Sequence, residues 1–72
     1  MPDQELVREV IEVATRLIDA SREGEIDGKA VAAEIDRPEI DLYWAFQEAK
    51  DQGALGMYFG GGMTLPSMIR RP

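Results

Sequence analysis

The best-spaced set of chemically active side chains in this 72-residue chain lies between residues 19 and 30, where oxygen donors recur as in a calcium-binding loop. Donors fall at positions one, three, five and nine of this twelve-residue run, and Gly24 stands at position six. The twelfth position requires a glutamate that holds calcium with both oxygens, but the residue there is Ala30. The sequence therefore favours a second interpretation, in which Gly24 ends a helix, residues 25–26 form a short strand, and Asp27 caps the next helix.

Side chains suited to catalysis are scarce. The chain has no Cys and no His, which removes thiolate ligands, the commonest transition-metal ligand and the usual general base. Ser21 and Ser67 have no His or Lys around them in a recognisable catalytic motif, and a domain of this size rarely encloses a substrate-sized cavity. We therefore predict a protein that is not an enzyme, with no catalytic residues, no metal, no cofactor and no small-molecule substrate.

Length and charge set further bounds. Seventy-two residues suit one small domain, and the formal net charge is −6. The first residues are acidic and lack a secretory pattern, and no apolar run approaches the roughly 18 residues needed to cross a bilayer. We therefore expect a cytoplasmic protein without a membrane partner. An acidic chain is repelled by nucleic-acid phosphates unless its cations are clustered.

The elements that must position any site begin with a helix over the first twenty residues. Its apolar residues recur at helical spacing and predict one buried face: Leu6, Val7, Val10, Ile11, Ala14, Leu17 and Ile18. Asp3 is suited to cap the start of this helix, because its carboxylate can accept hydrogen bonds from the first free amides. The apolar face is expected to form half of the core, although such a face could also serve in a dimer.

The second half of the chain predicts a short helix over residues 28–35, a turn at Asp36-Arg37-Pro38, and a helix over residues 38–52 that stops at Gly53. A glycine-tipped hairpin is expected over residues 57–65. The residues that carry the pattern are Val31, Ala32, Leu42, Phe46, Ala49, Gly53 and Leu55. This order resembles the winged helix-turn-helix domains of bacterial regulators. The resemblance implies an α+β fold with three helices and a C-terminal β-hairpin wing, a domain over residues 1–66 and a short tail over residues 67–72.

The third predicted helix has two apolar faces. At about 100° per residue, one face carries Leu42, Ala45, Phe46 and Ala49, and the opposite face carries Ile40, Trp44, Gln47 and Asp51, with Tyr43 at the edge. If the first face packs on the first helix, Trp44 is exposed, which is typical of an interaction site. The alternative, that Trp44 is buried beneath the wing, stays open at this point.

The predicted wing is apolar on both alternating faces, so that Tyr58 is expected to face solvent or a partner. Its tip, Gly60-Gly61-Gly62, permits a tight or mobile turn. Together with the outer face of the third helix, the wing predicts a surface for a protein partner or for self-association as a homodimer. The predicted partner-binding residues are Ile40, Tyr43, Trp44, Gln47 and Tyr58.

DNA binding is the alternative function. Winged helix-turn-helix domains commonly place the third helix in the major groove and the wing against the backbone. The residues available for such contacts are Arg37, Gln47, Lys50, Arg70 and Arg71. The charge distribution disfavours this role, because residues 37–52 carry two basic and four acidic side chains and residues 53–66 carry none of either. The sequence therefore favours a non-catalytic acidic recognition module in a regulatory context, with a DNA-binding transcription regulator as the alternative.

Overall fold

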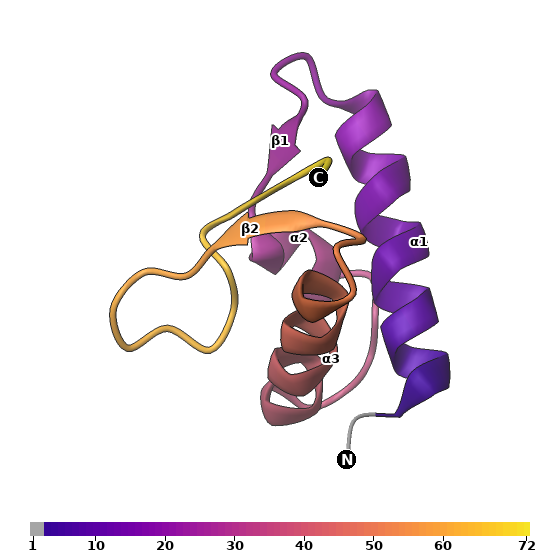
Figure 1. Ribbon diagram of the computed structural model, residues 1–72, viewed down its shortest axis with the longest axis vertical. Helices are drawn as coiled ribbons and strands as arrows, with labels where there is room; N and C mark the ends of the chain where they lie inside the picture. The colour runs from indigo at the N-terminus through magenta and orange to yellow at the C-terminus, as the bar shows by residue number, and fades with distance from the viewer. Residues whose placement is uncertain (1–2) are drawn as a thin grey trace.

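Three helices and a three-stranded antiparallel sheet make up the fold of this chain (Figure 1). The computed structural model describes residues 3–72. In chain order the elements are α1 (Gln4–Ala20), β1 (Glu25–Ile26), α2 (Gly28–Ala32), α3 (Glu39–Asp51), β2 (Gly56–Tyr58) and β3 (Met68–Arg70). The predicted α+β class with three helices is confirmed at this level.

Helix α1 begins as predicted but ends earlier. Asp3 caps it, since its Oδ1 accepts hydrogen bonds from the amides of Glu5 (2.9 Å) and Leu6 (3.4 Å). The helix ends at Ala20, so the prediction that Gly24 ends it is wrong. Ser21 is already extended, and its hydroxyl donates to the carbonyl of Glu25 (3.0 Å), which turns the chain out of the helix. Gly24 instead takes a left-handed conformation (φ +72°) in the loop that follows.

The strand and cap predicted after this loop are confirmed. Residues 25–26 form β1, and the Asp27 carboxylate accepts a hydrogen bond from the amide of Lys29 (2.9 Å) at the start of α2. The run that resembles a calcium loop is therefore divided between a helix end, a strand and a helix cap. Over residues 3–72 no group of three or more acidic side chains is arranged to hold a metal ion.

Helices α2 and α3 are shorter than predicted. Helix α2 ends at Ala32, although Ile35 in the following turn is still buried. Pro38 is the N-cap of α3 rather than its first residue, because its ψ of 146° is extended while its carbonyl accepts from the amides of Asp41 and Leu42 (3.1 Å each). The predicted stop is confirmed, since Gly53 takes the left-handed conformation (φ +74°) that closes many helices.

The sheet differs from the predicted hairpin. Strand β2 pairs with β3, which comes after Pro66, and β3 also pairs with β1, so that the strand order is β1-β3-β2. The predicted second strand, up to Leu65, is instead part of a long connecting loop over residues 59–67. The prediction of a short tail over residues 67–72 is therefore wrong for β3, which is the central strand and whose Ile69 is fully buried.

A close approach between α2 and the end of this loop fixes where β3 enters the sheet. The Gly28 amide donates to the Pro66 carbonyl (2.9 Å). A Cβ atom at Gly28 would lie 2.5 Å from that same carbonyl oxygen, so only glycine fits at the start of α2. Pro66 and Leu65 are both buried. The burial of these two residues directs the chain back over the core before β3 begins.

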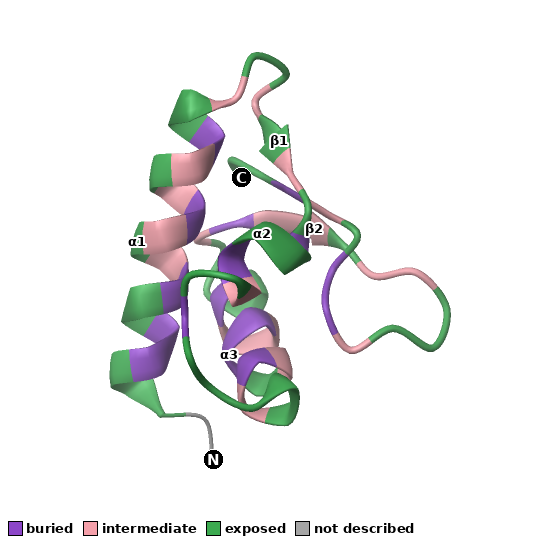
Figure 2. Ribbon diagram, turned by 180° about the vertical axis from the view of Figure 1, so that it is seen from behind, coloured by how far each residue is buried: buried purple, intermediate pink, exposed green. Residues whose placement is uncertain are grey.

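One apolar core joins all these elements. Helices α1 and α3 form its largest contact, and Figure 2 shows their buried residues on the sides that face each other. The predicted inner face of α3 is confirmed, because Leu42, Ala45, Phe46 and Ala49 are all buried. Within residues 3–72 the core contains no buried polar or charged side chain. No helix in the described part of the chain is long and apolar enough to cross a membrane.

Candidate functional site

The outer side of α3 is apolar although it faces solvent. Ile40 and Trp44 lie one turn apart on this side and are 54% and 53% exposed. Their position follows from the helical period, since Leu42 and Phe46 on the opposite side are held in the core. Of the two alternatives for Trp44, the exposed one is therefore correct. A half-exposed tryptophan beside an exposed isoleucine is typical of a binding surface.

Aromatic contacts connect this side of α3 to the loop after β2. The rings of Tyr43 and Trp44 are 5.1 Å apart at an angle of 74°, and those of Tyr43 and Phe59 are 5.9 Å apart at 72°. Both pairs have the edge-to-face geometry that aromatic rings prefer. We define the α3–loop surface as Ile40, Tyr43, Trp44 and Phe59. Tyr43 is its centre, because it contacts one ring on its own helix and one on the loop.

Polar contacts hold the loop beside α3. The Thr64 hydroxyl donates to a carboxylate oxygen of Glu39 (3.0 Å), in the first turn of the helix. At the base of the loop, the Ser67 amide donates to the Tyr58 carbonyl (2.8 Å). Figure 1 shows the loop projecting away from α1, on the side of the molecule where β2 ends. The α3–loop surface is therefore held by ring contacts and by a hydrogen bond to the loop.

The structure brings together only part of the predicted partner-binding set. Ile40, Tyr43 and Trp44 share the α3–loop surface, and Gln47 is half-buried one turn beyond Tyr43. Tyr58 is the most exposed of the aromatic residues, at 62%, but lies apart. Its neighbours on β2 and in the loop pack on the core, so its side chain points to the opposite face of the sheet. No ring contact joins it to the α3–loop surface in residues 3–72.

Phe59 is a member of this surface that the sequence-based prediction of the site did not include. The alternation of strand residues indicates that it faces inward together with Met57. Its contact with Tyr43 arises because the chain leaves β2 at this residue and turns beside α3. The sequence predicts that Phe59 points inward, but it does not predict the contact with Tyr43. That contact depends on the path of a nine-residue loop.

The basic residues predicted for DNA are dispersed and partly neutralised. Arg37 lies before α3 and pairs with Asp3 (3.7 Å) and Asp41 (3.5 Å). Arg71 forms an ion pair with Asp19 at the end of α1. The partners Asp3 and Asp19 stand at opposite ends of α1, and the C terminus lies between β1 and α1 (Figure 1). These two arginines therefore do not share a surface, and each has a carboxylate partner.

The remaining members of that set lie in other places. Arg70 is on β3, where it is opposite Glu25 of β1 in the register. Lys50 is exposed in the last turn of α3, at the opposite end of the helix from Arg37. Gln47 is the only residue shared with the partner-binding set. The structure thus forms no cluster of cations next to α3 among residues 3–72.

Acidic side chains dominate the rim of the α3–loop surface. Helix α3 carries Glu39, Asp41, Glu48 and Asp51 against one cation, Lys50. Asp41 and Glu48 stand three residues before and four residues after Trp44, which are the neighbouring positions on a helix surface. The nine residues of the loop carry no charge. Arg37 pairs with Asp41 (3.5 Å), so Glu48 is the carboxylate beside Trp44 that forms no ion pair within residues 3–72.

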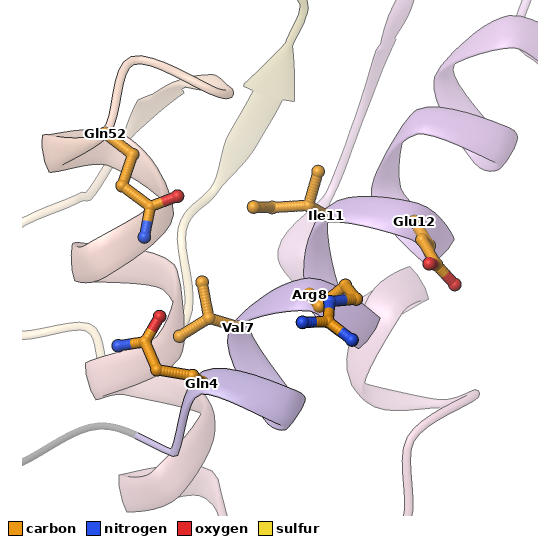
Figure 3. A pocket seen from close by; sticks show the side chains of 6 residues that line it. All are labelled: Gln4, Val7, Arg8, Ile11, Glu12 and Gln52. Carbon is orange, nitrogen blue, oxygen red and sulfur yellow. The ribbon is translucent and has the colours of Figure 1, made fainter.

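Two shallow hollows lie elsewhere on the molecule. The larger, about 280 Å³, is between α1 and the end of α3, and its lining residues are Gln4, Val7, Arg8, Ile11, Glu12 and Gln52. Figure 3 shows Gln4, Val7 and Gln52 pointing into the space between the two helices. The smaller, about 200 Å³, lies beside β1 and is lined mainly by acidic and polar side chains. Both are below the usual size of small-molecule sites, and neither contains a recognisable catalytic group.

No family model matches this chain, and no curated protein or solved structure shows significant similarity to it. A function therefore has to be inferred from the residues and geometry of the chain itself. The feature that stands out is the α3–loop surface: an exposed tryptophan in contact with the Tyr43 ring, which in turn contacts Phe59, with carboxylates among its neighbours on the helix. The two hollows and the dispersed basic residues provide weaker evidence for a binding site.

Proposed function

We propose that this chain is a non-catalytic winged-helix module that binds a protein partner through the α3–loop surface. The order of its elements and the strand order β1-β3-β2 support the winged-helix assignment, with the loop over residues 59–67 as the wing. In the regulator domains that the sequence resembles, the third helix and the wing are the parts that contact a ligand. In this chain the third helix carries the exposed Trp44, and the loop contributes the half-buried Phe59.

The observation that carries the proposal is the exposure of Trp44 on a helix that is otherwise well packed. The inner face of α3 already fills the core, so folding does not require a large apolar side chain on the outer face. Tryptophan is among the residues most enriched at the energetic centres of protein interfaces. The edge-to-face contact with Tyr43 restricts the indole ring before a partner arrives, which lowers the entropy cost of binding.

DNA binding is the second candidate, favoured by the resemblance to regulators and by the exposed Lys50 at the end of α3. Its electrostatics are unfavourable, because a protein gains affinity for DNA by neutralising several phosphates at once. Arg37 and Arg71 are engaged with carboxylates, and the wing offers no cation. We therefore rank protein recognition first.

A comparison of two aromatic variants tests the proposal. The immobilised wild-type chain and the Trp44→Ala and Tyr58→Ala variants are incubated with lysate of the source organism, and the retained proteins are quantified by mass spectrometry. We expect a partner that wild type and Tyr58→Ala retain equally and that Trp44→Ala loses at least ten-fold. Circular dichroism confirms that both variants are folded. A partner retained equally by all three would contradict the proposed surface.

A further inference from the structure

The surroundings of Trp44 indicate what kind of partner would fit it. On the helix surface its neighbours are Ile40, Asp41, Gln47 and Glu48, so that the exposed indole lies between one apolar and three polar side chains, two of them carboxylates. The face of an indole ring attracts cations more strongly than any other aromatic side chain. Arg37 already pairs with Asp41 (3.5 Å), but no cation pairs with Glu48 among residues 3–72, so the exposed ring beside Glu48 favours a positively charged group.

The ion pairs within residues 3–72 do not include Glu48, although one of them engages Asp41 beside Trp44. Three arginines pair with carboxylates: Arg16 with Glu34, Arg37 with Asp3 and Asp41, and Arg71 with Asp19. Helix α3 retains four acidic residues against Lys50, and the whole chain has a formal net charge of −6. Glu48 and the remaining net negative charge of α3 are consequently left for an external cation to neutralise.

A second copy of the chain fits this surface poorly. In a two-fold symmetric dimer the same surface contacts itself, so the acidic rim of one α3 would face the acidic rim of the other. Like charges brought together across an interface are destabilising. A stable dimer also requires about 800 Å² from each partner, whereas the α3–loop surface consists of four side chains, two of them half-buried. A short segment of opposite charge would not bring like charges together, and it would need a smaller contact area than a dimer.

We propose that the α3–loop surface binds a basic polypeptide segment, with an arginine or lysine side chain over the Trp44 ring and a further cation beside Glu48. The apolar neighbour Ile40 provides contact for the aliphatic stem of such a side chain. This inference rests on the proposed function and specifies the chemistry of the partner. It also explains why an acidic winged-helix chain would keep aromatic residues exposed on its third helix.

The test uses the ¹⁵N-labelled chain and three synthetic twelve-residue peptides that share two leucines and a serine–glycine background. One contains four arginines, the second four glutamates in their place, and the third four glutamines. We expect the arginine peptide to shift the Trp44 indole signal and the amides of residues 40–48 in a saturable way at physiological salt. The glutamate peptide should produce no shift, and the glutamine peptide should bind at least ten-fold more weakly.

Three variants separate a specific site from general attraction to an acidic protein. Trp44→Leu keeps an apolar side chain but removes the ring, and we expect it to weaken binding about two- to five-fold. Glu48→Gln should weaken binding by a similar factor, whereas Glu12→Gln, an exposed carboxylate on α1, should not. Equal effects of Glu48→Gln and Glu12→Gln, with Trp44→Leu unchanged, would overturn the inference.

Other outcomes distinguish this inference from the proposed function. The glutamine peptide could bind as tightly as the arginine peptide, with binding lost in Trp44→Leu. That result would overturn the inference of a basic partner, while the α3–loop surface would remain a protein-binding site. A concentration-dependent dimer in sedimentation equilibrium that Trp44→Ala dissociates would show that a second copy occupies the surface, and would also overturn it. Absence of binding to all three peptides would overturn the inference, and partner capture would still decide the proposed function.

Discussion

Helix α3 carries large apolar residues on two sides that differ in burial. Its inner side, with Leu42 and Phe46, is 1% exposed or less, whereas Ile40 and Trp44 on its outer side are more than half exposed. Residue type alone does not separate the two sides, because both carry large apolar residues. The separation comes from the packing partners: α1 covers the inner side, whereas the loop over residues 59–67 approaches the helix through Phe59 and Thr64. The inner side belongs to the core, and Ile40 and Trp44 on the outer side remain exposed.

The largest effect that would sharpen this comparison is expected for Phe46→Ala. The ring is fully buried at the contact of α3 with α1, and its removal leaves a cavity that a small core cannot close. We expect a loss of about 3–5 kcal/mol in the free energy of unfolding, which approaches the total stability of a domain this small. Urea unfolding followed by circular dichroism measures it. A loss below about 1 kcal/mol would show that this side is not the core that the structure describes.

Gly28→Ala tests the contact that positions β3. Its new methyl group would lie 2.5 Å from the Pro66 carbonyl oxygen, so the backbone must shift, and we expect a cost of about 1–3 kcal/mol. Gly61→Ala is the matched control, because nothing lies within 4 Å of a Cβ there. Thermal unfolding of the two variants gives the comparison. Equal melting temperatures would mean that α2 and the loop are not in close contact.

Trp44→Ala is expected to cost far less stability than Phe46→Ala. It removes one edge-to-face contact, worth about 0.5–1.5 kcal/mol, and some partly exposed area. We therefore expect a loss of about 1 kcal/mol in the same urea experiment, together with the loss of partner binding. A loss comparable to that of Phe46→Ala would break the distinction between the two sides of α3.

Thr64→Val should give the smallest change. It removes the exposed hydrogen bond from the wing to Glu39 while keeping the shape of the side chain, so we expect about 0.5–1 kcal/mol or less. The informative measurement is amide relaxation by NMR, in which residues 60–64 should become more mobile while α3 does not change. Unchanged relaxation would indicate that the ring contacts alone hold the wing.

Local patterns in the sequence were sufficient to predict the helices and their faces. The 3.6-residue period places Leu42 and Phe46 on one face and Trp44 on the opposite face, and the short side chains of Asp3 and Asp27 mark two helix starts. These features depend on neighbours within a few residues. The extent of exposure of Trp44 was open, since it depends on whether the wing covers it.

Features that depend on distant parts of the chain could not be predicted. Strand β3 has three residues, and its pairing with β1 joins residues 26 and 69, so no local periodicity marks it. The sequence pattern assigns Leu65 to the hairpin and Pro66 to its end, but both residues are buried in the loop. Their burial results from tertiary packing of the loop on the core, which no local pattern indicates. The ion pairs of Arg37 and Arg71 likewise join the ends of the chain to its helices.

The measurement that tests the central claim most directly is an HSQC titration of the labelled chain at physiological salt, first with the captured partner and then with random duplex DNA. The account predicts that the partner shifts the signals of Ile40, Tyr43, Trp44 and Phe59 and that DNA leaves the spectrum unchanged. Saturable shifts at Arg37, Gln47 and Lys50 on addition of DNA, with no response of Trp44 to the partner, would contradict it and would establish α3 as a DNA-recognition helix.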